Sequence, residues 1–126
     1  MSDFELTSTS GSPGVHLIAK TGDCKFTGYS IPQKTNDFYA PILSWFKEYA
    51  NNPAKETRLT MCMEYMDNAS RKIFLGILKL LKKVQDRGHT IVSVTWLSNM
   101  GNDDMLGLGE KFAELVELDF TFGNLD

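Results

Sequence analysis

The sequence has few of the residue types that build metal or nucleophilic sites. It contains two histidines, His16 and His89, and neither has a cysteine, a histidine or an acid at the spacing of a metal site. There is no GxSxG element, and the stretch GLGE lacks both the lysine of a phosphate-binding loop and a preceding strand. We therefore expect no catalytic residue, no metal ion and no cofactor.

Cysteines and long apolar runs are also scarce. The two cysteines, Cys24 and Cys62, lie inside strand-like runs, which favours reduced, buried thiols over a disulfide. The N-terminal stretch MSDFELTSTSGSPG has no basic residue and no apolar block, so it does not resemble a signal peptide. No run approaches the ~20 apolar residues of a membrane span. We therefore expect a cytoplasmic protein that does not act at a membrane.

The charge is small overall but unevenly distributed. A formal net charge of −3 gives no general attraction to nucleic acid. Six of the 13 basic residues fall in one segment, and they are Arg71, Lys72, Lys79, Lys82, Lys83 and Arg87. From Asp103 to the end there are seven acids and one base, Lys111. Either both segments are solvated faces on opposite sides of one domain, or one of them is a docking surface.

The length and composition fit one α/β domain. The chain has 126 residues, of which 42% are hydrophobic and 23% are charged. Residues 1–12 are rich in Ser and Thr and predict a flexible leader, and residues 13–126 predict a single domain. The patterning predicts the order β-β-α-β-α-β-α-β, which is a mixed sheet with a parallel βαβ core and helices packed on it.

The first half of the domain predicts a hairpin followed by a helix. Residues 15–31 (VHLIAKTGDCKFTGYSI) indicate two strands around a turn at Gly22, with a bulge or a close backbone approach at Gly28. The helix that follows buries one face at helical spacing, with Ile42, Trp45, Phe46 and Tyr49. Its expected N-cap is Thr35, Asn36 or Asp37.

The second half predicts a βαβ unit. Residues 56–66 (ETRLTMCMEYM) alternate over two largely apolar faces, and one face carries Leu59, Met61, Met63 and Tyr65. A helix over residues 69–87, with a core stripe from Ile73 to Val84, ends at Gly88. Because it leads into a strand over residues 89–98, the two strands should be parallel neighbours. A helix over 103–116 and a strand over 118–123 complete the domain.

The residues MDNAS join the strand to the second helix. In an open α/β sheet, ligand and partner sites gather outside the carboxyl ends of the parallel strands. The start of a helix has unpaired N–H groups and a positive dipole end, where a phosphate is stabilised. By composition alone, however, the same residues form an ordinary cap in which Asp67 or Asn68 accepts hydrogen bonds from the first turn.

Four stretches, in order along nearly the whole chain, resemble the SiaC-type regulatory phosphoproteins, a family first catalogued as a domain of unknown function. They are SPGVHL, GYSIPQKTNDFYAPILSWFKEY, YMDNASRKIFLGILKLL and VSVTW. The family's Ser-Tyr-Pro-Glu-like box is here Ser30-Ile31-Pro32-Gln33, and its polar turn is here Tyr65-Met66-Asp67-Asn68-Ala69-Ser70. The element order is also similar to the STAS domains of bacterial anti-sigma-factor antagonists, which implies a STAS-like fold.

The resemblance implies a non-enzymatic signalling protein that acts by partner switching. In such a switch a serine/threonine kinase phosphorylates the turn, a metal-dependent serine/threonine phosphatase reverses this, and the unmodified form binds and activates a diguanylate cyclase. The implied phospho-switch turn consists of Asp67, Asn68 and Ser70. The implied partner-binding residues are Tyr65, Arg71, Lys72, Ser30 and Pro32.

This chain departs from the family pattern at the phospho-acceptor. The family's acceptor threonine aligns with Asn68 and the next serine with Ala69, so only Ser70 keeps a hydroxyl. An asparagine cannot accept a phosphoryl group. Either Ser70 has become the acceptor, or the switch is lost and the neutral Asn68 holds the protein in a form like the unphosphorylated one. Both hypotheses retain the partner-binding role.

Two other classes of function are alternatives. A small enzyme or small-anion-binding protein would use Glu64 and Asp67 in a groove at the strand ends, and it would need a deep cavity. A nucleic-acid binder would use the Lys/Arg-rich helix, and its binding would weaken as salt rises. The aromatic side chains that stack on single-stranded nucleic acid do not accompany that helix, so we expect no nucleic-acid partner.

Overall fold

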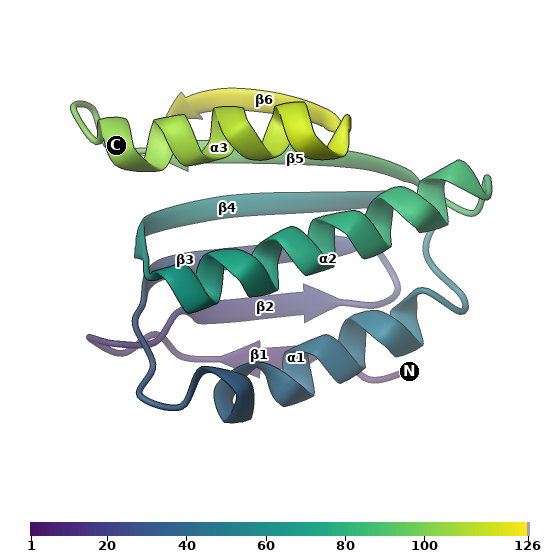
Figure 1. The fold of residues 1–126 in the computed structure, drawn as a ribbon. Helices are drawn as coiled ribbons and strands as arrows, with labels where there is room; N and C mark the ends of the chain where they lie inside the picture. The colour runs from purple at the N-terminus through teal and green to yellow at the C-terminus, as the bar shows by residue number, and fades with distance from the viewer. Residues whose placement is uncertain (126) are drawn as a thin grey trace.

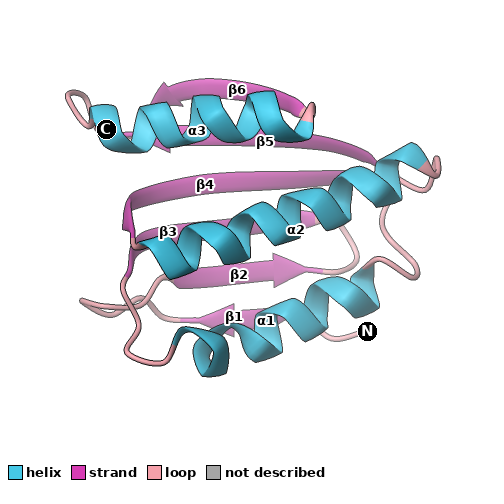
Figure 2. Cartoon of the chain, viewed as in Figure 1, coloured by secondary structure: helices cyan, strands magenta, loops and turns pink. Residues whose placement is uncertain are grey.

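In the computed structural model, which describes residues 1–125, six strands form one mixed sheet (Figures 1 and 2). The strands are β1 (Phe4–Leu6), β2 (Gly14–Ile18), β3 (Asp23–Ser30), β4 (Glu56–Met66), β5 (Ile91–Ser98) and β6 (Asp119–Asn124). The helices are α1 (Thr35–Tyr49), α2 (Asn68–Asp86) and α3 (Asp103–Val116). Strands β1 to β3 pair antiparallel and β3 to β6 pair parallel, in sequence order across the sheet. The predicted mixed α/β sheet with a parallel βαβ core is confirmed.

Strand β1 is an element that the sequence analysis did not predict. It lies within residues 1–12, which we expected to be a flexible leader, and it pairs with β2 through Phe4 opposite Leu17. The backbone carbonyl of Ser2 also accepts a hydrogen bond from the Trp45 indole at 2.9 Å. A strand of three residues is too short to show a clear alternation of apolar and polar residues. Strand β1 is therefore identified by its pairing with β2 and not by its own sequence pattern.

The three helices lie side by side on one face of the sheet (Figure 1). They cover the alternate apolar residues of the central strands, where Phe26 of β3 contacts Phe74 of α2 edge-on, with ring centroids 4.7 Å apart. Both cysteines are buried and unpaired, as predicted. The opposite face of the sheet carries more polar residues, including His16, Lys25, Thr60 and Thr95. None of the helices in residues 1–125 has the length and apolar content that a membrane crossing requires.

The start of α1 differs from the prediction. The N-cap is Lys34, whose side chain makes no capping hydrogen bond, and the expected caps Thr35, Asn36 and Asp37 lie inside the first turn. The predicted apolar face is nevertheless buried along its whole length, from Ile42 to Tyr49. Packing of this face against the sheet therefore determines where α1 lies, and a side-chain cap is not needed.

Close packing joins α3 to β5. The indole of Trp96 is buried and donates a hydrogen bond to the carbonyl of Met105 at 2.9 Å. Gly109 lies directly over this indole, and a Cβ added there would come within 2.6 Å of the ring. Gly107 lies two residues earlier on the same helix, and a Cβ added there would have no heavy atom within 4 Å. The two glycines therefore have different roles.

Alanine substitutions at these two positions should have opposite effects. Gly109→Ala should lower the free energy of unfolding by about 1–3 kcal/mol, because the methyl group forces the Trp96 ring and α3 apart. Gly107→Ala should raise it by about 0.5–1 kcal/mol, because alanine loses less backbone entropy in a helix. Urea unfolding measures both, and a Gly109→Ala protein as stable as wild type would contradict the packing described.

Candidate functional site

An extra residue in β4 sets the geometry of the polar turn. The β3–β4 register keeps in step as far as Gly28 opposite Met63, and then Tyr29 lies opposite Tyr65, so Glu64 is the inserted residue. The bulge was predicted near Gly28, but its effect on β4 was not. Alternation placed Tyr65 on the same face as Met63, whereas the bulge leaves Tyr65 41% exposed and turns Met66 into the core.

Asp67 is the N-cap of α2, and it is one of the two residues that were predicted to cap this helix. Its Oδ1 accepts a hydrogen bond from the backbone N–H of Ser70 at 2.9 Å. Its own N–H donates to the carbonyl of Ser30 at 2.9 Å, which ties the turn to the end of β3. Asn68 is then the first residue of the helix, and its side chain is exposed.

Ser70 lies inside the protein, with 0% of its surface exposed. Its hydroxyl is 2.7 Å from the hydroxyl of Ser30, which in turn is 2.5 Å from the hydroxyl of Tyr39 on α1. Burial raises the pKa of Tyr39 to about 12, so its phenol is neutral at physiological pH. Ser30, which we expected to face a partner, is also fully buried; it positions the turn and does not form part of the surface.

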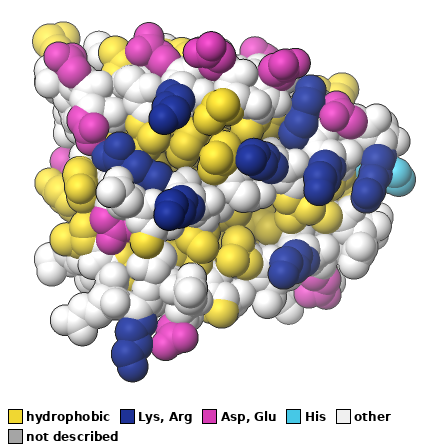
Figure 3. Space-filling model, in the orientation of Figure 1, with side chains coloured by type: hydrophobic (Ala, Val, Ile, Leu, Met, Phe, Trp, Pro, Cys, Tyr) yellow, Lys and Arg dark blue, Asp and Glu magenta, His cyan; other side chains and the backbone are white. Residues whose placement is uncertain are grey.

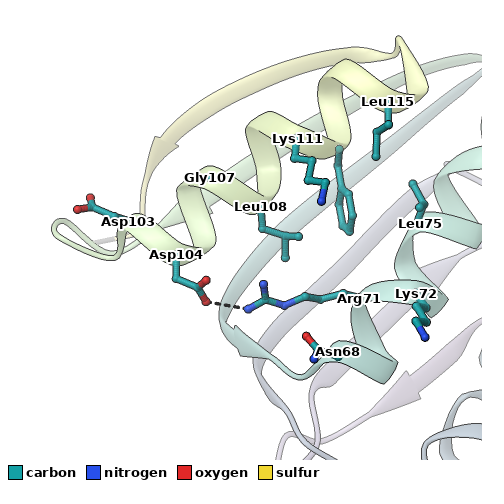
Figure 4. Close-up of a pocket in the computed structure, with 11 residues that line it drawn as sticks. Asn68, Arg71, Lys72, Leu75, Asp103, Asp104, Gly107, Leu108, Lys111 and Leu115 are labelled. Carbon is teal, nitrogen blue, oxygen red and sulfur yellow. Dashed lines mark hydrogen bonds and ion pairs between the residues drawn. The ribbon is translucent and has the colours of Figure 1, made fainter.

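Arg71 connects the turn to α3. Its Nε donates to the carbonyl of Met66 at 2.7 Å, and a terminal nitrogen forms an ion pair with Asp104 at 2.7 Å (Figure 4). The guanidinium carbon also lies 5.7 Å from the centre of the Tyr65 ring, within the range of a cation–π contact. The two expected partner-binding residues Tyr65 and Arg71 are therefore in contact with each other.

The two carboxylates of the enzymatic alternative have structural partners instead. The Glu64 carboxylate accepts a hydrogen bond from the Asn99 amide at 3.1 Å, and its backbone carbonyl accepts one from Asn102 at 3.0 Å. Asp67 caps α2, as described above. Neither acid lines the groove between α2 and α3 that is described next, so the geometry gives no support to paired acid–base chemistry at this turn.

A groove of about 540 Å³ runs between α2 and α3, starting at the turn (Figure 4). Its walls are Asn68, Arg71, Lys72 and Leu75 from α2 and Asp104, Leu108, Lys111 and Leu115 from α3. The sequence analysis identified the α2 side but missed the α3 side. The available signal was the spacing of Leu108, Lys111 and Leu115, which follows one edge of the α3 core stripe. Of the other expected residues, Pro32 is half-buried and lies outside the groove.

Aspartate substitutions should distinguish the buried position of Ser70 from the exposed position of Asn68. Ser70→Asp should lower the free energy of unfolding by more than about 3 kcal/mol, because it places a carboxyl group among buried hydroxyls. Asn68→Asp should raise it by about 0.3–1 kcal/mol, because the new charge lies at the helix N-terminus in water.

Ser70→Ala is the matched control for loss of the hydroxyl alone, and we expect it to cost about 0.5–1.5 kcal/mol. Denaturant unfolding of the three variants gives the comparison. Equal stability of Ser70→Asp and Asn68→Asp would contradict the buried placement of Ser70.

Comparison with known proteins gives a consistent family and fold. A family model described as SiaC family regulatory phosphoprotein matches residues 6–125. An uncharacterized protein of Pseudomonas aeruginosa (strain UCBPP-PA14) is 24% identical over 121 residues, which cover 96% of this chain and 95% of that protein.

Two crystal structures from P. aeruginosa share the fold. Apo-SiaC superposes with a TM-score of 0.88 at 22% identity, covering 97% of this chain and 98% of that chain. SiaC bound as activator to the diguanylate cyclase SiaD superposes with a TM-score of 0.89 at 21% identity, covering 97% and 99%. The family model spans nearly all the chain, and the protein described here belongs to the SiaC family of regulatory phosphoproteins.

Proposed function

We propose that this protein is a non-enzymatic regulator that binds and activates a diguanylate cyclase, and that Asn68 holds it permanently in the binding form. Family membership and the activator role of the similar SiaC protein support the cyclase as the class of partner. The observation that carries the proposal is the position of Asn68. It is exposed at the first residue of α2, which is the position that the sequence resemblance assigns to the family's acceptor threonine.

The placement of Ser70 supports a lost switch over a moved acceptor. A kinase must bring the acceptor hydroxyl into line with the γ-phosphate of ATP. The Ser70 hydroxyl is fully buried and bonded to Ser30, so it would reach a kinase only after the first turn of α2 had opened. That opening would break the Asp67 cap and the hydroxyl cluster together.

The charges around residue 68 explain why a neutral side chain there favours one form. Arg71 and Lys72 line the same end of the groove as Asn68. A phosphate at position 68 would add a charge of about −1.5 to −2 and compete with Asp104 for the Arg71 guanidinium. Because Asn68 carries no charge, the Arg71–Asp104 ion pair persists. The surface then keeps the charge and shape of an unphosphorylated regulator.

The same proposal assigns roles to the remaining expected residues. We expect Tyr65, Arg71, Lys72 and Pro32 to contact the partner. A serine/threonine kinase and a metal-dependent phosphatase would be partners of family members that keep the acceptor, and this chain would no longer respond to them. We expect the regulator to act in the cytoplasm, where a diguanylate cyclase finds its substrate GTP.

Restoring the acceptor should restore phosphorylation. After incubation with ATP and a SiaC-type partner-switching kinase, the wild-type protein should keep its intact mass, whereas Asn68→Thr should gain one phosphate. The reason is that only the variant presents a hydroxyl at position 68, where the resemblance places the acceptor that the kinase aligns with ATP. Ala69→Thr is the matched control, since it adds the same side chain at the next exposed position and should gain none.

The wild-type protein and Asn68→Thr should also differ in how kinase treatment affects their activation of a cyclase. Wild type should bind a SiaD-type diguanylate cyclase and raise cyclic di-GMP production, and treatment with kinase and ATP should reduce activation only for Asn68→Thr. A phosphate on the wild-type protein that disappears in Ser70→Ala would refute the lost switch. Failure of the wild type to bind or activate the cyclase would refute the regulatory role itself.

A further inference from the structure

Strand β6 forms an open edge of the sheet. It is the last strand in the sheet order of the described residues, and it pairs only with β5 (Figure 1). The Leu125 N–H donates to the Ser98 carbonyl at 3.0 Å, so the backbone groups of residue 125 face β5. Because backbone groups alternate in direction along a strand, those of Phe120, Phe122 and Asn124 face away from β5. The edge therefore presents N–H and C=O groups that a further strand can pair with.

The two edges of the sheet differ in their protection against pairing. Natural edge strands avoid pairing by being short, by carrying charged side chains or proline, or by bulging. Strand β1 is three residues long and has Glu5 at its centre. Strand β6 is six residues long, and residues 120–125 (FTFGNL) contain no charged residue and no proline. Its register with β5 is continuous from Asp119 to Asn124. The β6 edge thus lacks the features that prevent pairing.

Apolar side chains gather beside this edge. An aromatic row runs from the buried Trp96 to Phe120, with ring centroids 6.3 Å apart, and on to Phe122, 5.8 Å further. Phe122, the outermost ring, is 39% exposed, and Leu106 and Met100 are exposed as well. These three side chains line one hollow of about 330 Å³. Exposed apolar side chains that gather in one place indicate a contact surface.

We propose that β6 pairs antiparallel with β6 of a second copy of this chain, around a two-fold axis at Phe122. In this register Phe122 lies opposite its own copy, and Phe120 lies opposite Asn124. The outward backbone groups of these three residues would supply roughly six hydrogen bonds, which join the two sheets into one. The inference goes beyond the proposed function and does not depend on it, because β5 and α3 separate this edge from the turn at the start of α2.

The residues of the edge favour a second copy as the occupant. A strand that pairs with itself must carry no like charges at facing positions, and residues 120–125 meet this condition. Pairing about a two-fold axis is closed, since it uses the free β6 edge of both copies, whereas pairing of β6 with β1 would continue into a filament. Leu106 and Met100 lie beside Phe122 in the same hollow, so they extend the apolar contact near the axis.

Acidic side chains near the edge oppose this pairing and limit its strength. Glu110, Glu114 and Asp119 are exposed, and Figure 3 shows acidic side chains along the α3 margin. The two-fold axis brings the acidic margins of the two copies towards each other, and salt screens their repulsion. The contact is also smaller than a standard interface of ~1,600 Å². We therefore expect a dimer with a dissociation constant of roughly 10–100 μM that tightens as salt rises.

Sedimentation equilibrium of the full-length protein at about 5–500 μM tests this inference. The wild type should change from monomer to dimer over this range. Phe122→Lys should raise the dissociation constant at least about tenfold, because it places like charges at the axis and removes the aromatic contact. Leu115→Lys is the matched control, since it makes the same change of charge at an exposed leucine of α3 that faces α2, and it should dimerise like the wild type.

Asn124→Pro tests the backbone pairing separately. Proline removes the N–H of residue 124, which faces away from β5, so the monomer loses no hydrogen bond of its own sheet. The dissociation constant should rise at least about tenfold. Asn124→Ala keeps the N–H and should dimerise like the wild type. Far-ultraviolet circular dichroism checks that every variant is folded.

Phe122→Cys tests the position of the axis. Facing residues of a hydrogen-bonded antiparallel pair have Cα atoms about 5.5 Å apart, which is within the range of a disulfide. With oxidised glutathione, Phe122→Cys should form a disulfide-linked dimer, and Leu115→Cys should form none. The native Cys24 and Cys62 are buried and should not react.

The inference is overturned if the wild type stays a monomer at about 500 μM, which would leave the edge to a strand of a different protein. It is also overturned if Phe122→Lys and Asn124→Pro dimerise as well as their controls, or if Phe122→Cys cross-links no better than Leu115→Cys. Loss of the dimer in Asn124→Pro and its retention in Asn124→Ala would support pairing through the backbone. None of these measurements involves a cyclase, so their outcome is independent of the proposed function.

Discussion

Hydrogen bonds to Ser30 hold the first turn of α2 against the end of β3, and the functional geometry depends on them. The Ser30 carbonyl accepts from the Asp67 N–H at 2.9 Å and from the Ser70 hydroxyl at 3.3 Å. The Ser30 hydroxyl continues to Tyr39, so β3, α1 and α2 share one buried polar cluster. Buried hydroxyls are costly unless paired, and this pairing fixes which side of the turn faces inward. Asn68 faces outward as a consequence.

The identity of residue 68 is therefore independent of the hydrogen bonds that hold the turn. The cap is supplied by Asp67, and the inward contacts are supplied by Ser70. Residue 68 contributes to neither, so an acceptor threonine and a neutral asparagine fit the same backbone. A chain can therefore carry either residue at this position without losing the fold.

Much of the fold was predictable from local pattern, whereas the site was predictable only in part. The hairpin, the βαβ unit and the three helices follow from periodicity and glycine positions, because each is encoded within one stretch of chain. The face of Tyr65 was mispredicted because a bulge depends on the register with the neighbouring strand and leaves the alternation intact. Burial of Ser30 and the accessible Leu115 depend on how separate elements pack, so no single stretch encodes them.

The Arg71–Asp104 ion pair is suited to a switch because it is weak. Its partners are 23% and 58% exposed, and a pair at this exposure contributes about 0–1 kcal/mol. A phosphate dianion at residue 68 would offer Arg71 a stronger, charge-assisted partner on the same helix. A coupling of about 1–3 kcal/mol changes affinity by roughly 5- to 150-fold, so exchanging one such contact is sufficient for regulation. With asparagine at residue 68 there is no phosphate to compete for Arg71, and the guanidinium pairs with Asp104 across α2 and α3.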